Sequence, residues 1–151
     1  MKLRSCCQIV AVSMMIGCGG TYDSYVTGVV TLDSTPLTRG TVSFKPLSSG
    51  PTAYGFIESN GQFSMKTGSE AGLPPGEYSV TVVANEPSIV NPDGGPPTPG
   101  TPITPPWYRS SSTSGLERTI EAGSNEVNFD LSTEPPADWN PEPKKKRRKR
   151  R

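Results

Sequence analysis

Histidine is absent from this chain of 151 residues, and cysteine is confined to its first 18 positions. Without histidine the chain lacks the commonest general base and the commonest metal ligand of the neutral pH range. Because the three cysteines are Cys6, Cys7 and Cys18, the rest of the chain has no residue for a disulfide, a thiolate nucleophile or a zinc site. The serines also lack a nearby base. We therefore expect a protein that is not an enzyme and uses no metal and no cofactor.

Charge is divided sharply between the body and the end of the chain. Residues 144–151 are all basic, whereas positions 19–143 carry five basic and fourteen acidic residues, a net charge of −9. The carboxylates fall mostly at expected turns and lack the D-x-D-x-D-G spacing of a calcium loop, so we expect them to be solvated.

The first residues have the pattern of an exported protein. Lys2 and Arg4 precede an apolar run that is too short to span a membrane, and the small residue Gly17 comes before Cys18. Met15 to Cys18 resembles the lipobox of bacterial lipoproteins, whose cysteine is diacylated and becomes the new N-terminus. Residues 1–17 are then the signal peptide and 18–24 the lipidated tether. Ordinary secretion with an incidental cysteine is the alternative.

Alternating apolar residues predict a sheet from residue 25 to 131, and no stretch shows a clear helical period of 3.6. The clearest part is 26–46, which we interpret as a β-hairpin with a turn rich in Asp, Ser and Thr. The runs 52–58 and 62–66 flank Asn60-Gly61, a strong hairpin signal, so we expect them to pair. Small residues on the inner side of 52–58, including Gly55, suggest close approach of another backbone. The runs 77–84, 116–121 and 125–131 complete seven strands, and 77–84 is expected to be central.

These strands predict a core. Its expected members are Val30, Leu32, Val42, Phe44, Phe63, Tyr78, Val80, Val82, Ile120, Val127, Phe129 and Leu131.

A proline-rich loop interrupts the pattern at 85–115, where eight prolines prevent a regular sheet. A connection this long is expected to be functional or disordered. Trp107, Tyr108 and Arg109 at its end place two aromatic rings beside a cation, as a sugar- or peptide-binding surface does. The alternative is that these aromatic residues fold back and anchor the loop over the end of the core.

Several motifs in order carry a family resemblance. The lipobox, VTGVVTLDSTPLTRGTVSFKP, ESNGQF, LPPGEYSVTV and the late TSGL and NEVNFDL resemble small bacterial lipoproteins common in planctomycetes, which carry a carboxypeptidase-regulatory-like or transthyretin-like domain. The resemblance implies a seven-stranded β-sandwich of the Ig-like or transthyretin-like (prealbumin) type with no assigned reaction. It also implies attachment to the cell envelope, facing the periplasm, and the residue after Cys18 favours the outer membrane.

The chain ends in a Pro-rich linker, 132–143, and a polybasic tail, 144–151, both expected to be disordered like the N-terminus. The tail could contact anionic lipid or another envelope polyanion, and the lipobox argues against nucleic acid as its partner. The alternative is that the tail is a solvated extension without a partner. The expected polyanion contacts are Lys144, Lys145, Lys146, Arg147, Arg148, Lys149, Arg150 and Arg151.

The sequence thus predicts a non-enzymatic, lipid-anchored β-sandwich that serves as a structural or binding module. One alternative is a carbohydrate- or peptide-binding module that uses the Pro-rich loop, and another is a polyanion-binding protein that uses the tail. Neither a protein partner nor an oligomeric state follows from these patterns.

Overall fold

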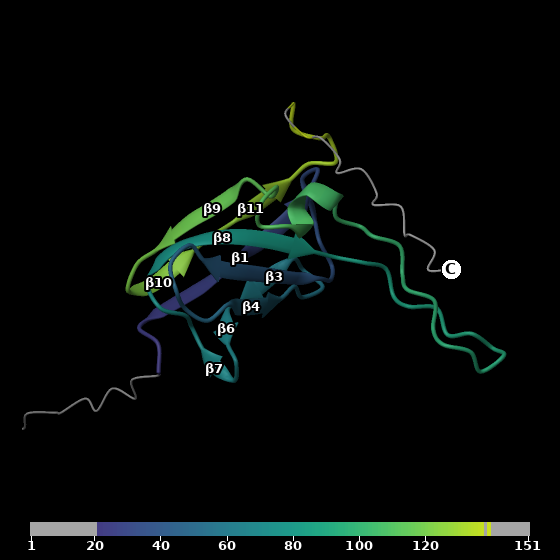
Figure 1. The fold of residues 1–151 in the computed structure, drawn as a ribbon, viewed down its shortest axis with the longest axis horizontal. Coiled ribbons are helices and arrows are strands. Elements are labelled where there is room, and N and C mark those ends of the chain that lie inside the picture. Colours follow the sequence, from purple (N-terminus) through teal and green to yellow (C-terminus); the bar gives the residue numbers. More distant parts are fainter. Residues whose placement is uncertain (1–20, 138, 140–151) are drawn as a thin grey trace, which may run out of the picture.

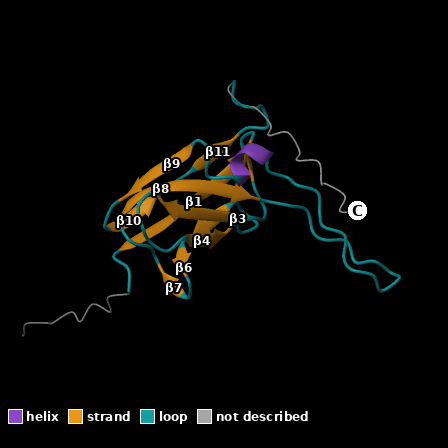
Figure 2. Cartoon of the chain, viewed as in Figure 1, coloured by secondary structure: helices purple, strands orange, loops and turns teal. Residues whose placement is uncertain are grey.

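The computed structural model describes residues 21–137 and 139, which form two β-sheets with their apolar faces packed together (Figure 1). The first sheet contains β1 (Ser24–Leu32), β2 (Thr35–Pro36), β5 (Gln62–Ser64), β10 (Gly123–Glu126) and β11 (Phe129–Leu131). The second runs in the order β7 (Glu70–Ala71), β6 (Lys66–Thr67), β4 (Ala53–Phe56), β3 (Thr41–Pro46), β8 (Gly76–Val83) and β9 (Leu116–Ile120). Within this part of the chain the one helical element is a 3₁₀ turn, η1 (Pro106–Arg109), drawn in purple in Figure 2. The prediction of an all-β fold is confirmed.

Strand β1 lies at the centre of the first sheet. On one edge it pairs in parallel with β10 and β11, so that Val30 lies opposite Phe129. On the other edge it pairs antiparallel with β2 and β5. The parallel pairing means that the first and last strands run in the same direction. The chain therefore enters the domain at one pole and leaves it at the other, as the alternation of strands predicts.

The predicted hairpin over 26–46 is wrong, because its two long strands lie in different sheets. Asp33 and Ser34 both have positive φ, 48° and 66°, which is the conformation of a two-residue hairpin turn. The chain therefore reverses at once, and the short strand β2 pairs with the end of β1. Residues 37–40 then carry the chain to the second sheet, where β3 pairs with β4 and β8.

The predicted pairing of the third and fourth runs is confirmed at its two ends and is wrong between them. Glu58 donates its N–H to the carbonyl of Gln62 at 2.8 Å. Beyond that turn the chain divides its pairing: Ser64 pairs with Thr27 of β1, whereas Lys66 pairs with Tyr54 of β4. The run therefore changes sheet at Met65, which is buried at the crossing.

The core contains the predicted side chains, and its centre is aromatic. Phe44 packs against Tyr78 and Phe129 with ring centroids 5.8 and 6.1 Å apart, and Phe63 stacks on Phe129 at 6.1 Å. Of the twelve predicted core residues, eleven are buried and Leu32 is half-buried at the margin. Strand β8 lies between β3 and β9, so its predicted central position is confirmed.

The last predicted strand is interrupted. Strands β10 and β11 are separated by two residues, 127 and 128, at which the chain stays beside β1 through a hydrogen bond from the N–H of Val127 to the carbonyl of Thr27 (2.8 Å). With the short strands β2, β6 and β7, the described residues form eleven strand segments in place of seven runs.

The proline-rich loop has two parts with different structures. Residues 85–102 form an arm that leaves the end of β8 and extends away from the sheets (Figure 1). Residues 103–115, including η1, return to the sandwich, where Ile103 packs against the core and the Thr104 hydroxyl accepts a hydrogen bond from the N–H of Ala84 (3.0 Å). We refer to residues 85–102 as the arm.

Candidate functional site

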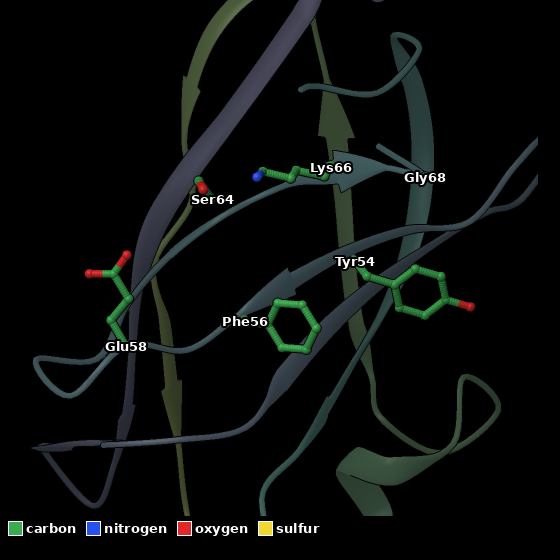
Figure 3. A pocket seen from close by; sticks show the side chains of 6 residues that line it. All are labelled: Tyr54, Phe56, Glu58, Ser64, Lys66 and Gly68. Atoms are coloured by element: carbon green, nitrogen blue, oxygen red, sulfur yellow. The ribbon is translucent and has the colours of Figure 1, made fainter. Parts of the chain in front are cut away.

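An open groove lies on the outer face of the second sheet, beside β4. It has a volume of about 490 Å³ and is lined by Tyr54, Phe56, Glu58, Ser64, Lys66 and Gly68 (Figure 3). We refer to it as the aromatic groove.

Strand alternation places the two aromatic residues on this outer face. Ala53 and Gly55 of β4 point into the core, so Tyr54 and Phe56 point outward. Gly55 is required at its position, since a Cβ there would lie 2.8 Å from both the Met65 sulfur and the Ser64 carbonyl oxygen. The close backbone approach predicted from the small residues is therefore present. Tyr54 is 50% exposed and Phe56 is 78% exposed, the latter a large apolar surface for a side chain in a sheet.

The groove exists because the neighbouring strand divides between the two sheets. Ser64 belongs to the first sheet and Lys66 to the second, so the outer surface opens beside β4 at this fork. Among the described registers, Phe56 pairs with Thr41 of β3 and with no residue on the β6 side. In Figure 3 the rings of Tyr54 and Phe56 lie next to each other along β4, with Glu58 beyond Phe56 and Lys66 extending toward Ser64.

The groove combines two aromatic rings with one carboxylate, one ammonium group and two hydroxyls, those of Tyr54 and Ser64. A second depression of about 440 Å³ adjoins it over the first sheet, shares Glu58 and Ser64, and adds Glu126. Among residues 21–137 and 139, no three His, Cys, Asp or Glu side chains come together as metal ligands would. The arrangement suits binding, in which rings supply apolar contact and the flanking groups fix orientation.

The predicted contact residues Trp107, Tyr108 and Arg109 lie on η1, at the base of the arm. Trp107 is only 7% exposed, and its ring packs against Tyr108 and Trp139 with centroids 5.9 and 5.5 Å apart. This geometry departs from the exposed aromatic surface expected at Trp107 and matches the alternative, in which the aromatic residues anchor the loop.

Hydrogen bonds show what this anchor holds. The Tyr108 hydroxyl accepts from the N–H of Ser132 at 3.1 Å, which attaches the exit of β11. The Thr113 hydroxyl donates to the Trp107 carbonyl at 2.8 Å, and the Arg109 guanidinium donates to the Asn85 side chain at 3.5 Å. The cluster thus fastens the return of the arm and the start of the linker to the same pole of the sandwich.

The other predicted site residues, Cys18 and the basic residues 144–151, lie outside the described residues. No helix in the described part of the chain has the length and apolar character needed to cross a membrane. Comparison with known proteins yields no matching family model, no matching curated protein and no matching solved structure.

Sequence reasoning did not identify the aromatic groove. The alternation in 52–58 does assign Tyr54 and Phe56 to the outer side, opposite the small residues. Two outward aromatic residues on one strand were the available signal. The groove beside these two residues forms because the neighbouring strand changes sheet at Met65. This change of sheet is a tertiary feature, which the alternation of side chains does not show.

Proposed function

We propose that this chain is a non-enzymatic, lipid-anchored β-sandwich of the cell envelope that binds an extended, proline-rich polypeptide segment in its aromatic groove. The observation that carries the proposal is the exposed pair Tyr54 and Phe56 beside Lys66 and Glu58. The site of the peptide-binding alternative thereby moves from the proline loop to the outer face of β4.

The spacing of the two rings supports this ligand class. Residues i and i+2 of a strand lie ~6.6 Å apart along the chain. Alternate side chains of an extended ligand segment also lie ~6.6 Å apart on one face, so alternate prolines of such a segment match Tyr54 and Phe56. Aromatic-lined grooves recognise proline-rich segments because the ligand is already extended and loses little conformational entropy on binding.

Calorimetric titration with a short polyproline peptide and a matched Gly-Ser peptide tests the proposal. We expect the polyproline peptide to bind and the Gly-Ser peptide not to bind, and we expect Phe56→Ala to weaken binding at least about tenfold, as loss of an aromatic anchor does. Leu47→Ala is the matched control, because Leu47 is 55% exposed and lies at the opposite end of β3. Equal binding by the Phe56 and Leu47 variants overturns the proposal. So does binding of envelope polysaccharide, in place of peptide, that depends on Phe56.

The anchor in this proposal is Cys18, with residues 1–17 removed as a signal peptide and the outer membrane as the destination. The short tether before β1 supports it, since the domain begins six residues after Cys18. Labelled palmitate should be incorporated by the parent chain and not by Cys18→Ser. Unchanged labelling of the variant would show that this cysteine is not the acylated one.

We also propose that the sandwich is of the seven-stranded, Ig-like or transthyretin-like type carried by the carboxypeptidase-regulatory-like lipoproteins. The two-sheet packing and the central β8 support that assignment. An experimental structure with a different strand order would contradict it.

Contact of the basic tail with an envelope polyanion is a second candidate function. It is supported by the position of Trp139, whose ring packs on Trp107 at the pole where β11 ends. Lys144 follows Trp139 by five residues, a reach of ~16 Å at ~3.1 Å per residue. A strand of seven residues makes the sandwich ~23 Å tall. Because this reach is shorter than the sandwich, we favour as the partner of the tail a polyanion near the pole where β11 ends, and not the membrane that holds Cys18.

Binding to vesicles of graded anionic content tests the second candidate. Binding should fall with salt and with deletion of 144–151, because exposed charges are screened. Binding that is unaffected by salt and by the deletion would show that the tail is a solvated extension without a partner.

A further inference from the structure

The arm is a two-stranded ribbon with its own backbone hydrogen bonds. Ile89 and Thr98 exchange two hydrogen bonds of 2.9 Å, and the N–H of Glu86 donates to the carbonyl of Thr101 at 2.8 Å. A Cβ at Gly100 would overlap the Glu86 carbonyl oxygen, which shows how closely the two segments approach. At the tip, the Asn91 side-chain amide donates to the carbonyl of Pro96.

The register of the arm assigns its side chains to two faces. Asn85 lies opposite Pro102 and Ile89 opposite Thr98, so Val90 lies opposite Pro97 and Ser88 opposite Pro99. Val90, Pro97 and Pro99 therefore share one face. Val90 is 78% exposed, and both prolines are exposed. The arm that carries this apolar face extends away from its own sandwich (Figure 1).

The face also contains the feature that the aromatic groove selects. Pro97 and Pro99 are two residues apart on one face of an extended segment, the spacing that matches Tyr54 and Phe56 in the proposed function. The groove itself is lined by both Lys66 and Glu58, so we expect the contact to depend on its apolar side chains.

We propose that the arm of one copy docks in the aromatic groove of a second copy, with Val90, Pro97 and Pro99 on Tyr54 and Phe56. This inference rests on the proposed function and names the polypeptide segment that the groove binds.

The position of the groove allows the exchange to be reciprocal. Phe56, Thr41 and Val83 form one row across β4, β3 and β8, so Phe56 lies ~10 Å from the strand end at which the arm begins. When one arm reaches across the partner's groove, the partner's own arm starts within that distance and can run back across the first groove. Such an isologous contact closes as a two-fold dimer and leaves no arm free to build a filament.

Disulfide capture between two separately labelled copies tests the docking. Both full chains carry Ser in place of Cys6, Cys7 and Cys18 and are held in non-ionic detergent; one adds Glu58→Cys in the groove and the other Ser88→Cys on the arm, so that Phe56 and Val90 are kept. Mild oxidation of the mixture should yield a disulfide-linked heterodimer. The control mixture pairs Ser88→Cys with Leu47→Cys, and it should lose that product because Leu47 lies at the far end of β3.

Sedimentation of the full chain supplies the second readout. A contact of this kind falls in the weak class of interfaces, below about 1,200 Å² in total, so we expect a concentration-dependent monomer–dimer equilibrium. Val90→Asp should weaken it about tenfold or more, whereas Ile89→Asp, on the opposite face of the arm, should weaken it less. Both substitutions are at exposed positions, which keeps loss of folding out of the comparison.

The outcomes separate this inference from the proposed function. Equal disulfide yields from the two mixtures, together with polyproline binding that requires Phe56, would overturn docking of the arm and leave peptide binding intact. Equal yields without any polyproline binding would overturn both. Capture that is specific for Glu58→Cys supports docking even if the free polyproline peptide binds weakly, because the arm is held in its bound shape.

Discussion

Asp33 and Thr133 are 100 residues apart in the sequence and are joined by two hydrogen bonds. The N–H of Thr133 donates to the Asp33 carboxylate at 3.1 Å, and the Thr133 hydroxyl donates to its other oxygen at 2.7 Å. Asp33 lies in the turn that ends β1, and Thr133 follows β11. The pair therefore fastens the exit of the domain to its first turn, at the same pole as the Trp107 anchor.

This pair predicts a change of stability in acid. The hydroxyl and N–H of Thr133 favour the carboxylate and hold the pKa of Asp33 below its ordinary value of 3.8. The stabilisation is present above that value and is lost as the pH falls through the folded pKa. The Tm difference between the parent and Asp33→Asn should therefore shrink between pH 6 and about pH 2.5. Asparagine tolerates the positive φ, so the turn is kept. A difference that stays constant across this range would contradict the assignment.

Tyr78 predicts a change at the alkaline end. Its hydroxyl donates to the carbonyl of Pro74 at 2.6 Å. Burial, with a smaller repulsion from Tyr22, raises the pKa of Tyr78 above its ordinary value of 10.0. This stabilisation is complete below pH 10 and is lost as the pH rises through the folded pKa. Tyr78→Phe should cost about 1 kcal/mol at neutral pH, and its Tm should fall less steeply than the parent's above pH 10. Parallel alkaline melting curves would count against this role.

One phenylalanine of the core and one of the aromatic groove should differ in their contribution to stability. Phe129 packs on Phe44 and Phe63 and has the Arg118 guanidinium 4.9 Å from its ring centroid. Phe129→Ala should lower the free energy of unfolding by about 3 to 5 kcal/mol. Phe56→Ala, at an exposed position, should change it by about 0.5 kcal/mol or less. Denaturant titration measures both, and similar costs for the two variants would show that the strand registers are wrong.

Gly28 has a steric role in the first sheet. A Cβ at this position would overlap the carbonyl oxygen of Val127, where the chain passes from β10 to β11 beside β1. Gly28→Ala should therefore destabilise the protein by about 1 to 3 kcal/mol. Gly95→Ala in the arm is the control, since its nearest neighbour would be 3.7 Å from the new Cβ. Equal melting temperatures for the two variants would contradict this explanation.

The burial of side chains could be predicted from sequence because alternation depends only on which face of a strand is apolar. Val30 and Val42 point inward whether their strands pair in one sheet or face each other across two. Alternation therefore cannot distinguish a hairpin from a sandwich crossing. The decisive signal was local, a two-residue turn at Asp33 and Ser34, which lacks the Gly that usually occupies the second position of such a turn.

The candidate site could be predicted only in part, for a different reason. The outward orientation of Tyr54 and Phe56 follows from the small inward residues of β4. Trp107 and Tyr108 could be assigned equally to a surface or to an anchor, because an aromatic residue after a long loop serves either purpose. What decides between them is the position of Trp139 and Ser132, which come from beyond the last strand.

Mapping of a polyproline peptide by NMR on the isotopically labelled full chain tests the central claim most directly. The amide shifts that change on titration should cluster at Tyr54, Phe56 and Lys66, and they should vanish in Phe56→Ala while Leu47→Ala retains them. Shift changes that instead cluster around Leu47, or no shift changes at saturating peptide, would contradict the proposal that the aromatic groove binds polypeptide.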